Sequence, residues 1–152
     1  HSTSSAASDV YKRQIESRTE RPVHIIHGNV DINVREEVRS IAESSDNNII
    51  LGSYGTMSTG VNIKRLHHVI FASPSKSRVR VLQSIGRGLR KGKGKDKCVL
   101  YDIADDFRQD KYGKENFTYK HLSERIKFYV EQDFTYRITS IPLSSSEAEL
   151  PI

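Results

Sequence analysis

The chain has 152 residues, of which 36% are hydrophobic and 28% charged, with a formal net charge of +5. This size and balance predict one soluble globular domain, exclude a disordered chain and favour polyanionic partners. No apolar run reaches the roughly 20 residues of a membrane span, so we expect no membrane partner, and the lone cysteine fits a protein of the reducing cytoplasm. The single cysteine, Cys98, excludes an internal disulfide, and its apolar surroundings (CVLYDI) indicate a buried core thiol.

The first 14 residues, HSTSSAASDVYKRQ, are rich in serine and alanine. They have no apolar core and are therefore not a signal peptide. Because they look like a translated cloning adaptor, we interpret residues 1–14 as a non-native leader. We expect the remaining residues to be a piece of a longer protein.

The first half of the chain alternates predicted strands with a predicted helix. VHII at 23–26 and NIILGSY at 48–54 are short apolar runs typical of buried strands. Between them, apolar residues recur at helical spacing, with Asp31 or Asn33 as the N-cap. The segment 55–66 is so rich in Gly, Ser and Thr that we predict no regular structure there.

The second half continues the alternation. HVIFA at 68–72 predicts a third strand and KCVLYDIAD at 97–105 a fourth. Between them, Ser75 is predicted to cap a helix over 76–90 whose apolar stripe is Val79, Leu82, Ile85 and Leu89. A further helix over 118–132 and a final strand over 134–143 complete the predicted elements.

Strands separated by helices at this spacing predict parallel βαβ units, and hence an α/β fold with an open, mostly parallel sheet and flanking helices. We assign residues 15–110 to this domain, 111–143 to a C-terminal helix and strand extension, and 144–152 to a loose tail. Functional loops of such sheets lie at the carboxyl ends of the strands. That places the segments 52–60 and 73–77 on one edge.

The helix over 76–90 combines an apolar stripe with a cationic one. Gln83, Arg87 and Arg90 fall at i, i+4 and i+7, and the guanidiniums of the two arginines offer forked donors to phosphate. Gly86 and Gly88 each cost about 1 kcal/mol in a helix, which indicates a close approach of backbone or ligand. The alternative is a solvated basic face.

Other candidate sites are weaker. The chain contains no GxxxxGK[ST] sequence and so no complete nucleotide cradle. The loop SYGTMSTGVNI at 53–63 could wrap a sugar-phosphate backbone or could be a plain connection. No metal site is predicted. We interpret the histidines as packing or surface residues (His24, His27, His67, His68 and His121). The aspartates after the fourth strand are interpreted as residues that cap and solvate a turn (Asp102, Asp105 and Asp106).

From about residue 22 to 143 the chain resembles the second, C-terminal RecA-like domain of superfamily 2 helicases. STGVNI at 58–63 resembles motif V, and QSIGRGLR at 83–90 resembles motif VI, Q-x-x-G-R-x-x-R. A His-Gly turn, HHVIF and VLYDIADD add to the likeness, which is greatest to phage recombination helicases.

The resemblance implies a nucleotide site at an interdomain cleft. ATP with Mg²⁺ would be held mainly by an N-terminal RecA-like domain that this chain does not contain. Arg87 and Arg90 would reach the γ-phosphate as catalytic residues, one of them as an arginine finger. Gln83 would position them, and Gly60 and Asn62 would line the nucleotide side. Many relatives have Asp at position 62, so here the contact to ribose would be polar but uncharged.

Nucleic acid is the second implied partner. Ser53, Tyr54, Gly55 and Thr56 would contact the backbone of branched or single-stranded DNA, or of RNA. The implied function is the motor domain of an ATP-dependent DNA helicase that unwinds or remodels branched DNA and is inactive as a fragment. The alternatives are a non-enzymatic nucleic-acid-binding module and a double-stranded DNA translocase that does not separate strands.

The resemblance also implies that the domain lacks its first strand, where the leader stands instead. The unpaired groups of a bare sheet edge seek a partner. We therefore expect either that residues 8–20 form a surrogate helix against the sheet, or that two copies of the chain associate.

Overall fold

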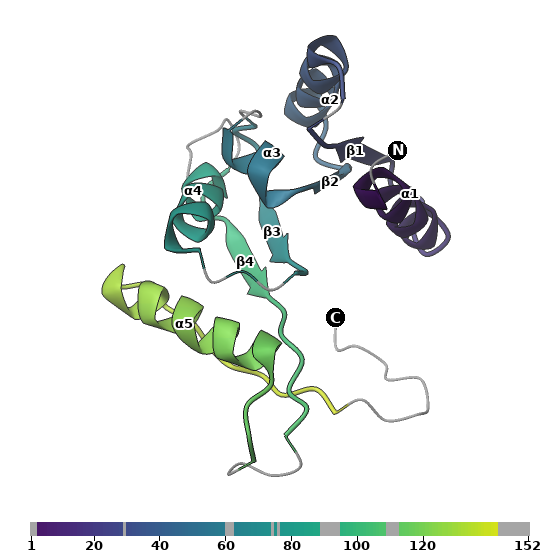
Figure 1. The fold of residues 1–152 in the computed structure, drawn as a ribbon. Coiled ribbons are helices and arrows are strands. Elements are labelled where there is room, and N and C mark those ends of the chain that lie inside the picture. Colours follow the sequence, from purple (N-terminus) through teal and green to yellow (C-terminus); the bar gives the residue numbers. More distant parts are fainter. Residues whose placement is uncertain are drawn as a thin grey trace.

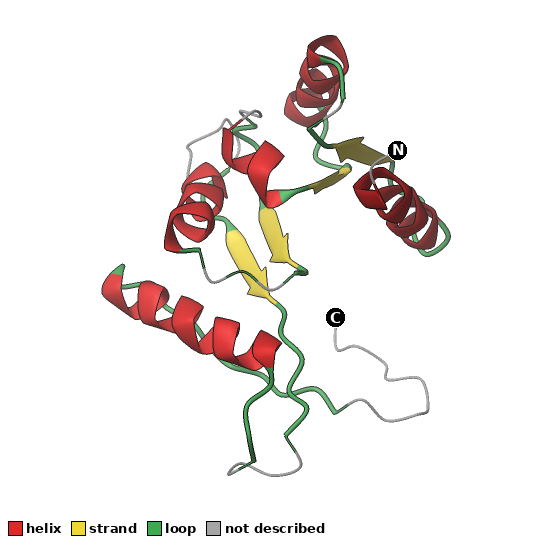
Figure 2. Cartoon of the chain, viewed as in Figure 1, coloured by secondary structure: helices red, strands yellow, loops and turns green. Residues whose placement is uncertain are grey.

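The structure, a computed structural model, describes residues 3–28, 30–59, 63–73, 75, 77–88, 95–108 and 113–142. Helices and strands alternate along this part of the chain (Figure 1), and Figure 2 shows the same view coloured by secondary structure. The helices are α1 (Thr3–Glu16), α2 (Ile32–Ser44), α3 (Tyr54–Thr59), α4 (Arg78–Gly88) and α5 (Phe117–Glu131). The strands are β1 (Val23–Ile26), β2 (Ile49–Gly52), β3 (His68–Phe71) and β4 (Val99–Asp102).

The strands form two parallel pairs. In one, Val23 of β1 is opposite Ile49 of β2, and in the other, His68 of β3 is opposite Val99 of β4. The predicted α/β class and the parallel pairing are confirmed. Among the described residues the four strands are divided between two two-stranded sheets.

A first core lies between the β1–β2 pair and α2. The N-cap of α2 is Asp31, whose carboxylate accepts a hydrogen bond from the backbone N–H of Asn33 at 2.7 Å. Val38 and Ala42 then fall on one face of α2 and pack with Ile26 of β1. Helix α1 contains most of the leader 1–14 and contacts β1, whereas the surrogate helix was expected over 8–20.

A second core joins β3, α4 and α5. Phe71, Val81, Ile85 and Tyr129 are buried together there. Ile85 belongs to the predicted stripe of α4. Among the side chains of this helix that the structure describes, the one with 0% exposure is Val81, which that stripe omitted.

The remaining members of the predicted α4 stripe are less informative. Leu82 is half-buried, the side chain of Val79 is outside the described set, and so is residue Leu89.

The open face of the β3–β4 pair carries exposed apolar residues. Successive side chains of a strand point to opposite faces, so Val69 and Phe71 face α4, while Ile70 points away. Ile70 is 60% exposed, and on the neighbouring strand Tyr101 is 48% exposed. Parallel sheets are normally covered on both faces, so this face is incompletely covered in the described structure.

Three local predictions were wrong. Helix α3 occupies 54–59, where no regular structure was predicted, because the Ser53 hydroxyl accepts a hydrogen bond from the N–H of Thr56 at 3.3 Å and starts the helix. Ser75 is not the N-cap of α4, because the helix begins at Arg78. The residue just before it is Ser77, whose carbonyl accepts a hydrogen bond from the N–H of Val81 at 3.0 Å. The residues 134–142 form no strand, because none of the described strands pairs with them.

Candidate functional site

Two loops at the carboxyl ends of different strand pairs meet through Tyr54. Its ring packs on Phe71 with a centroid distance of 5.3 Å, and its hydroxyl donates a hydrogen bond to the Ser73 carbonyl at 2.9 Å. Tyr54 begins α3, just after β2, whereas Ser73 lies in the turn between β3 and α4. The two segments are therefore in contact, although the strands that they follow, β2 and β3, belong to different two-stranded sheets.

The four residues predicted to contact nucleic acid differ in their exposure to solvent. Ser53 and Gly55 are exposed, and nothing lies within 4 Å of the position that a Cβ on Gly55 would take. Thr56 is buried, with its hydroxyl oxygen 2.9 Å from that of Ser53. Tyr54 is half-buried, and burial raises the pKa of its phenol. Ser53 and Gly55 therefore form the accessible part of this loop.

Helix α4 leaves Gln83, the first residue of the predicted motif VI, on a side that is not packed. Gln83 is exposed, while Val81, Ser84 and Ile85 are buried. Arg87 stands four residues after Gln83 in the same helix. The Gln83 position therefore lies off the buried face, as predicted.

Other predicted site residues cannot be placed. The side chain of Arg87 is outside the described set, as are residues Gly60, Asn62 and Arg90. Their assignments stay predictions.

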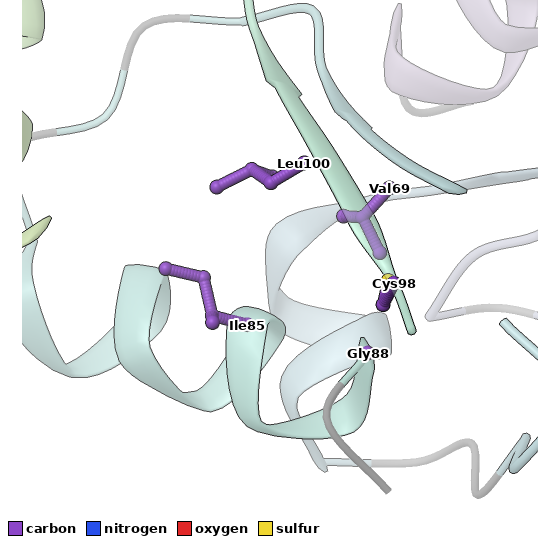
Figure 3. A pocket seen from close by; sticks show the side chains of 5 residues that line it. All are labelled: Val69, Ile85, Gly88, Cys98 and Leu100. Carbon is purple, nitrogen blue, oxygen red and sulfur yellow. The ribbon is translucent and has the colours of Figure 1, made fainter. Parts of the chain in front are cut away.

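The two glycines of α4 have different surroundings. A Cβ on Gly86 would meet no atom within 4 Å, whereas one on Gly88 would stand 2.7 Å from Cys98 Sγ and 3.3 Å from Val69 Cγ2. A close approach is thus found at Gly88, but it is made by side-chain atoms and not by the backbone or ligand that was expected. Figure 3 shows a cavity of about 30 Å³ beside Gly88, which is lined by Val69, Ile85, Gly88, Cys98 and Leu100.

Cys98 behaves as a packing residue. It is half-buried beneath Gly88, and burial raises the pKa of its thiol. A raised pKa keeps the thiol protonated, whereas a nucleophilic cysteine needs a lowered one.

Asp102 does not solvate a turn, so this part of the prediction was wrong. Its carboxylate accepts hydrogen bonds from Arg125 Nε at 2.8 Å, from Arg125 Nη2 at 2.7 Å and from the Tyr129 hydroxyl at 2.6 Å. Burial disfavours the charge on Arg125, but this carboxylate keeps the pKa of Arg125 raised. Burial and the bond to Asp102 also raise the pKa of Tyr129.

Sequence reasoning missed Arg125. The signal was available, because Arg125 lies in the predicted helix 118–132 between Leu122 and Ile126, two apolar residues at helical spacing. A charge in that position needs a buried partner. What the sequence did not contain was the choice of Asp102 as that partner.

Two further side chains of types that can bind metals, Asp106 and His121, make contacts within the protein. The Asp106 carboxylate accepts hydrogen bonds from Arg108 within the same turn, and the ring of the buried His121 lies 3.9 Å from that of Phe117. Among the described residues, no three His, Cys, Asp or Glu side chains gather in a group that could hold a metal ion. None of the described helices is long and apolar enough to cross a membrane.

Comparisons with known proteins agree with the motifs. Residues 2–92 match the family described as helicase conserved C-terminal domain. The ATP-dependent DNA helicase uvsW of Enterobacteria phage T4 is 36% identical over 129 residues, which make up 80% of this chain and 26% of that protein. A protein of Acanthamoeba polyphaga mimivirus, named as an ATP-dependent RNA helicase, is 33% identical over 112 residues, 70% of this chain and 21% of its own length.

A solved structure supports the fold. The C-terminal part of the Fun30 ATPase domain superposes with a TM-score of 0.56 at 16% identity, covering 84% of this chain and 46% of that one. The chain thus spans about a quarter of the length of the viral relatives. Its family match covers more than half of its residues and includes the motif VI helix, so the chain belongs to the helicase conserved C-terminal domain family.

Proposed function

We propose that this chain is the C-terminal motor domain of an ATP-dependent superfamily 2 helicase that unwinds or remodels branched DNA. The observation that supports this most directly is the hydrogen bond from Tyr54 to Ser73. It joins the loop predicted to contact nucleic acid to the turn that leads into the motif VI helix. A motor needs such a connection, because strand movement has to be linked to the nucleotide site.

ATP with Mg²⁺ is held mainly by the N-terminal RecA-like domain of the same protein. This chain fits the role of second partner, since Gln83 is exposed and Gly86 borders open space on α4. When bound there, the nucleotide supplies the phosphoryl group that is transferred to water. Arg87 and Arg90 stabilise the charge that develops on it, and one of them acts as the arginine finger.

The remaining polar residues position the two ligands. Gln83 orients the arginines, and Gly60 and Asn62 line the nucleotide side of the cleft. Ser53 and Gly55 approach the backbone of the nucleic acid closely because Gly55 has no side chain and Ser53 offers a hydroxyl. RNA is the second candidate substrate, since one relative is named as an RNA helicase.

The test uses the longer protein that carries this chain together with its N-terminal RecA-like domain. Arg87→Ala and Arg90→Ala should each lower kcat for ATP hydrolysis by roughly 10³-fold or more. Arg39→Ala is the matched control, because Arg39 pairs with Glu36 on the surface of α2. The chain alone should not hydrolyse ATP, with or without DNA.

Substrate class is tested in the same protein with branched DNA, single-stranded DNA with a duplex end, and RNA duplexes. Unwinding of branched DNA is expected. Movement along duplex DNA without strand separation would show that the protein is a translocase and not a helicase. Turnover by the chain alone, or an Arg90→Ala enzyme with normal kcat, would refute the motor assignment.

A further inference from the structure

Arg125 is a charged residue for which the proposed function has no role, yet it is the largest fully buried side chain among the described residues. Its side chain is 0% exposed, and that of its partner Asp102 is 10% exposed. Burying such a pair is expensive, and replacing it by apolar residues often leaves stability unchanged or improved. Stability alone is therefore a poor reason for an arginine here.

The geometry of Arg125 links three elements of the fold. Two of its nitrogens bind Asp102, the last residue of β4, and the third, Nη1, donates to the Ser75 carbonyl at 2.9 Å. Ser75 lies in the turn between β3 and α4, three residues before the first residue of α4. Because a guanidinium is planar and rigid, its pairing with Asp102 fixes where the nitrogen meets Ser75.

The same turn is also held by the first residue of α3. The Tyr54 hydroxyl donates to the Ser73 carbonyl, two residues before the carbonyl that Arg125 binds. The turn thus has one support from the loop of Ser53 and Gly55 and another from α5. Helix α5 lies outside the residues 2–92 that match the helicase family.

We propose that Arg125 is a positioning residue for ATP hydrolysis, acting through the turn at 73–75 on the start of α4. This rests on the proposed function, in which α4 carries the motif VI arginines. With Arg125 in place, the turn is fixed on the α5 side, so that a movement of the Tyr54 loop reaches α4. Without the bond to Ser75, the turn moves independently and α4 loses its exact approach to the nucleotide.

The decisive variant is Arg125→Lys, measured in the longer protein with nucleic acid present. Lysine keeps the charge opposite Asp102 but cannot bind both its oxygens and the Ser75 carbonyl in this planar geometry. A misplacement of about 1 Å can cost roughly 100-fold in rate, so we expect kcat to fall about 10- to 100-fold while KM for ATP stays within about twofold. Tyr129→Phe is the matched control, because it removes a bond to the same carboxylate and leaves Ser75 bound.

A second readout does not depend on activity. In the 152-residue chain, Arg125→Lys should speed hydrogen exchange at the N–H of Val81, which donates to Ser77 at the start of α4, and Tyr129→Phe should not. If Arg125→Lys fails to fold, Tyr54→Phe removes the other support of the turn and should lower kcat as well.

The outcomes separate the two proposals. A wild-type protein without ATP hydrolysis refutes the proposed function. Wild-type hydrolysis with an unchanged kcat in Arg125→Lys, or an equal fall of kcat in Tyr129→Phe, refutes only the positioning role. Unchanged exchange at Val81 in Arg125→Lys refutes the link to α4 whatever the activity is.

Discussion

Replacing Gly88 by alanine tests how closely α4 lies on the β3–β4 pair. The new Cβ would stand 2.7 Å from Cys98 Sγ and 3.3 Å from Val69 Cγ2, so some of these atoms must move. Overpacking of this kind costs about 1–3 kcal/mol, and alanine returns up to about 1 kcal/mol through its helix propensity. The cavity of about 30 Å³ at the same place lets the thiol give way a little. We therefore expect a net loss of about 1 kcal/mol.

The assay is equilibrium unfolding of the chain in urea, repeated in a Cys98→Ala background. Removing Sγ leaves Cys98 Cβ, at 3.6 Å, and the Val69 methyl as the nearest neighbours of the new Cβ. In that background Gly88→Ala should be close to neutral, which gives a coupling free energy of about 1 kcal/mol between the two positions. Gly86→Ala is the control, and should raise stability by up to about 1 kcal/mol because its Cβ meets nothing.

Two results would refute this reasoning. One is a Gly88→Ala protein that is as stable as Gly86→Ala, since the helix would then have room that the structure denies. The other is an equal loss with and without the Cys98 sulfur, since the clash would then involve another atom.

Three further predictions concern pH, association and salt. The pKa values of Tyr54 and Tyr129 are raised above 10.0 in the folded chain, so the stability they contribute is complete below pH 10 and falls as pH rises further. The fall is at most about 1.4 kcal/mol per pH unit for the buried Tyr129 and smaller for the half-buried Tyr54. Unfolding measured from pH 9 to about 11 should show a shallower fall in Tyr129→Phe, and equal slopes would contradict the raised pKa of Tyr129. If the open face of the β3–β4 pair mediates self-association, light scattering should detect dimers that Ile70→Lys abolishes and the exposed α2 variant Val34→Lys retains; monomers at all concentrations would exclude it. Binding of single-stranded DNA should weaken linearly in log affinity against log salt, through counterion release, and equal affinity at about 50 and 200 mM salt would contradict a backbone contact.

The elements that were predictable are those whose signals are local. Helix α2 was predicted because its N-cap, Asp31, and its apolar spacing lie within one short segment. Helix α3 was missed because its Gly, Ser and Thr content argues against a helix, although Ser53 provides a cap. The residues 134–142 alternate as a strand would, but alternation cannot show whether a partner strand is available.

The same difference between local and long-range signals applies to the candidate site. The residues proposed to meet ligands, such as Arg87 and Ser53, come from local motifs and from the resemblance that these motifs carry, and their roles stay predictions. Their supports are not readable, since Arg125 and Asp102 are 23 residues apart and an aspartate after a strand has many ordinary explanations.

This division affects how mutations in the domain should be interpreted. Replacing Arg125 by an uncharged residue removes a buried charge, and breaking such a pair costs about 3–5 kcal/mol, so any loss of activity would usually be ascribed to unfolding. Yet the same side chain binds the Ser75 carbonyl at the entrance to α4, and loss of that bond alone would act on the rate. The two effects are separated only by comparing kcat at equal folded fraction with that of Tyr129→Phe, a variant that loses a bond to Asp102 and keeps the bond from Arg125 to Ser75. Under the proposed positioning role, a residue outside the matched segment 2–92 contributes to ATP hydrolysis. Measurements of kcat, and not of stability, decide whether Arg125 has that role.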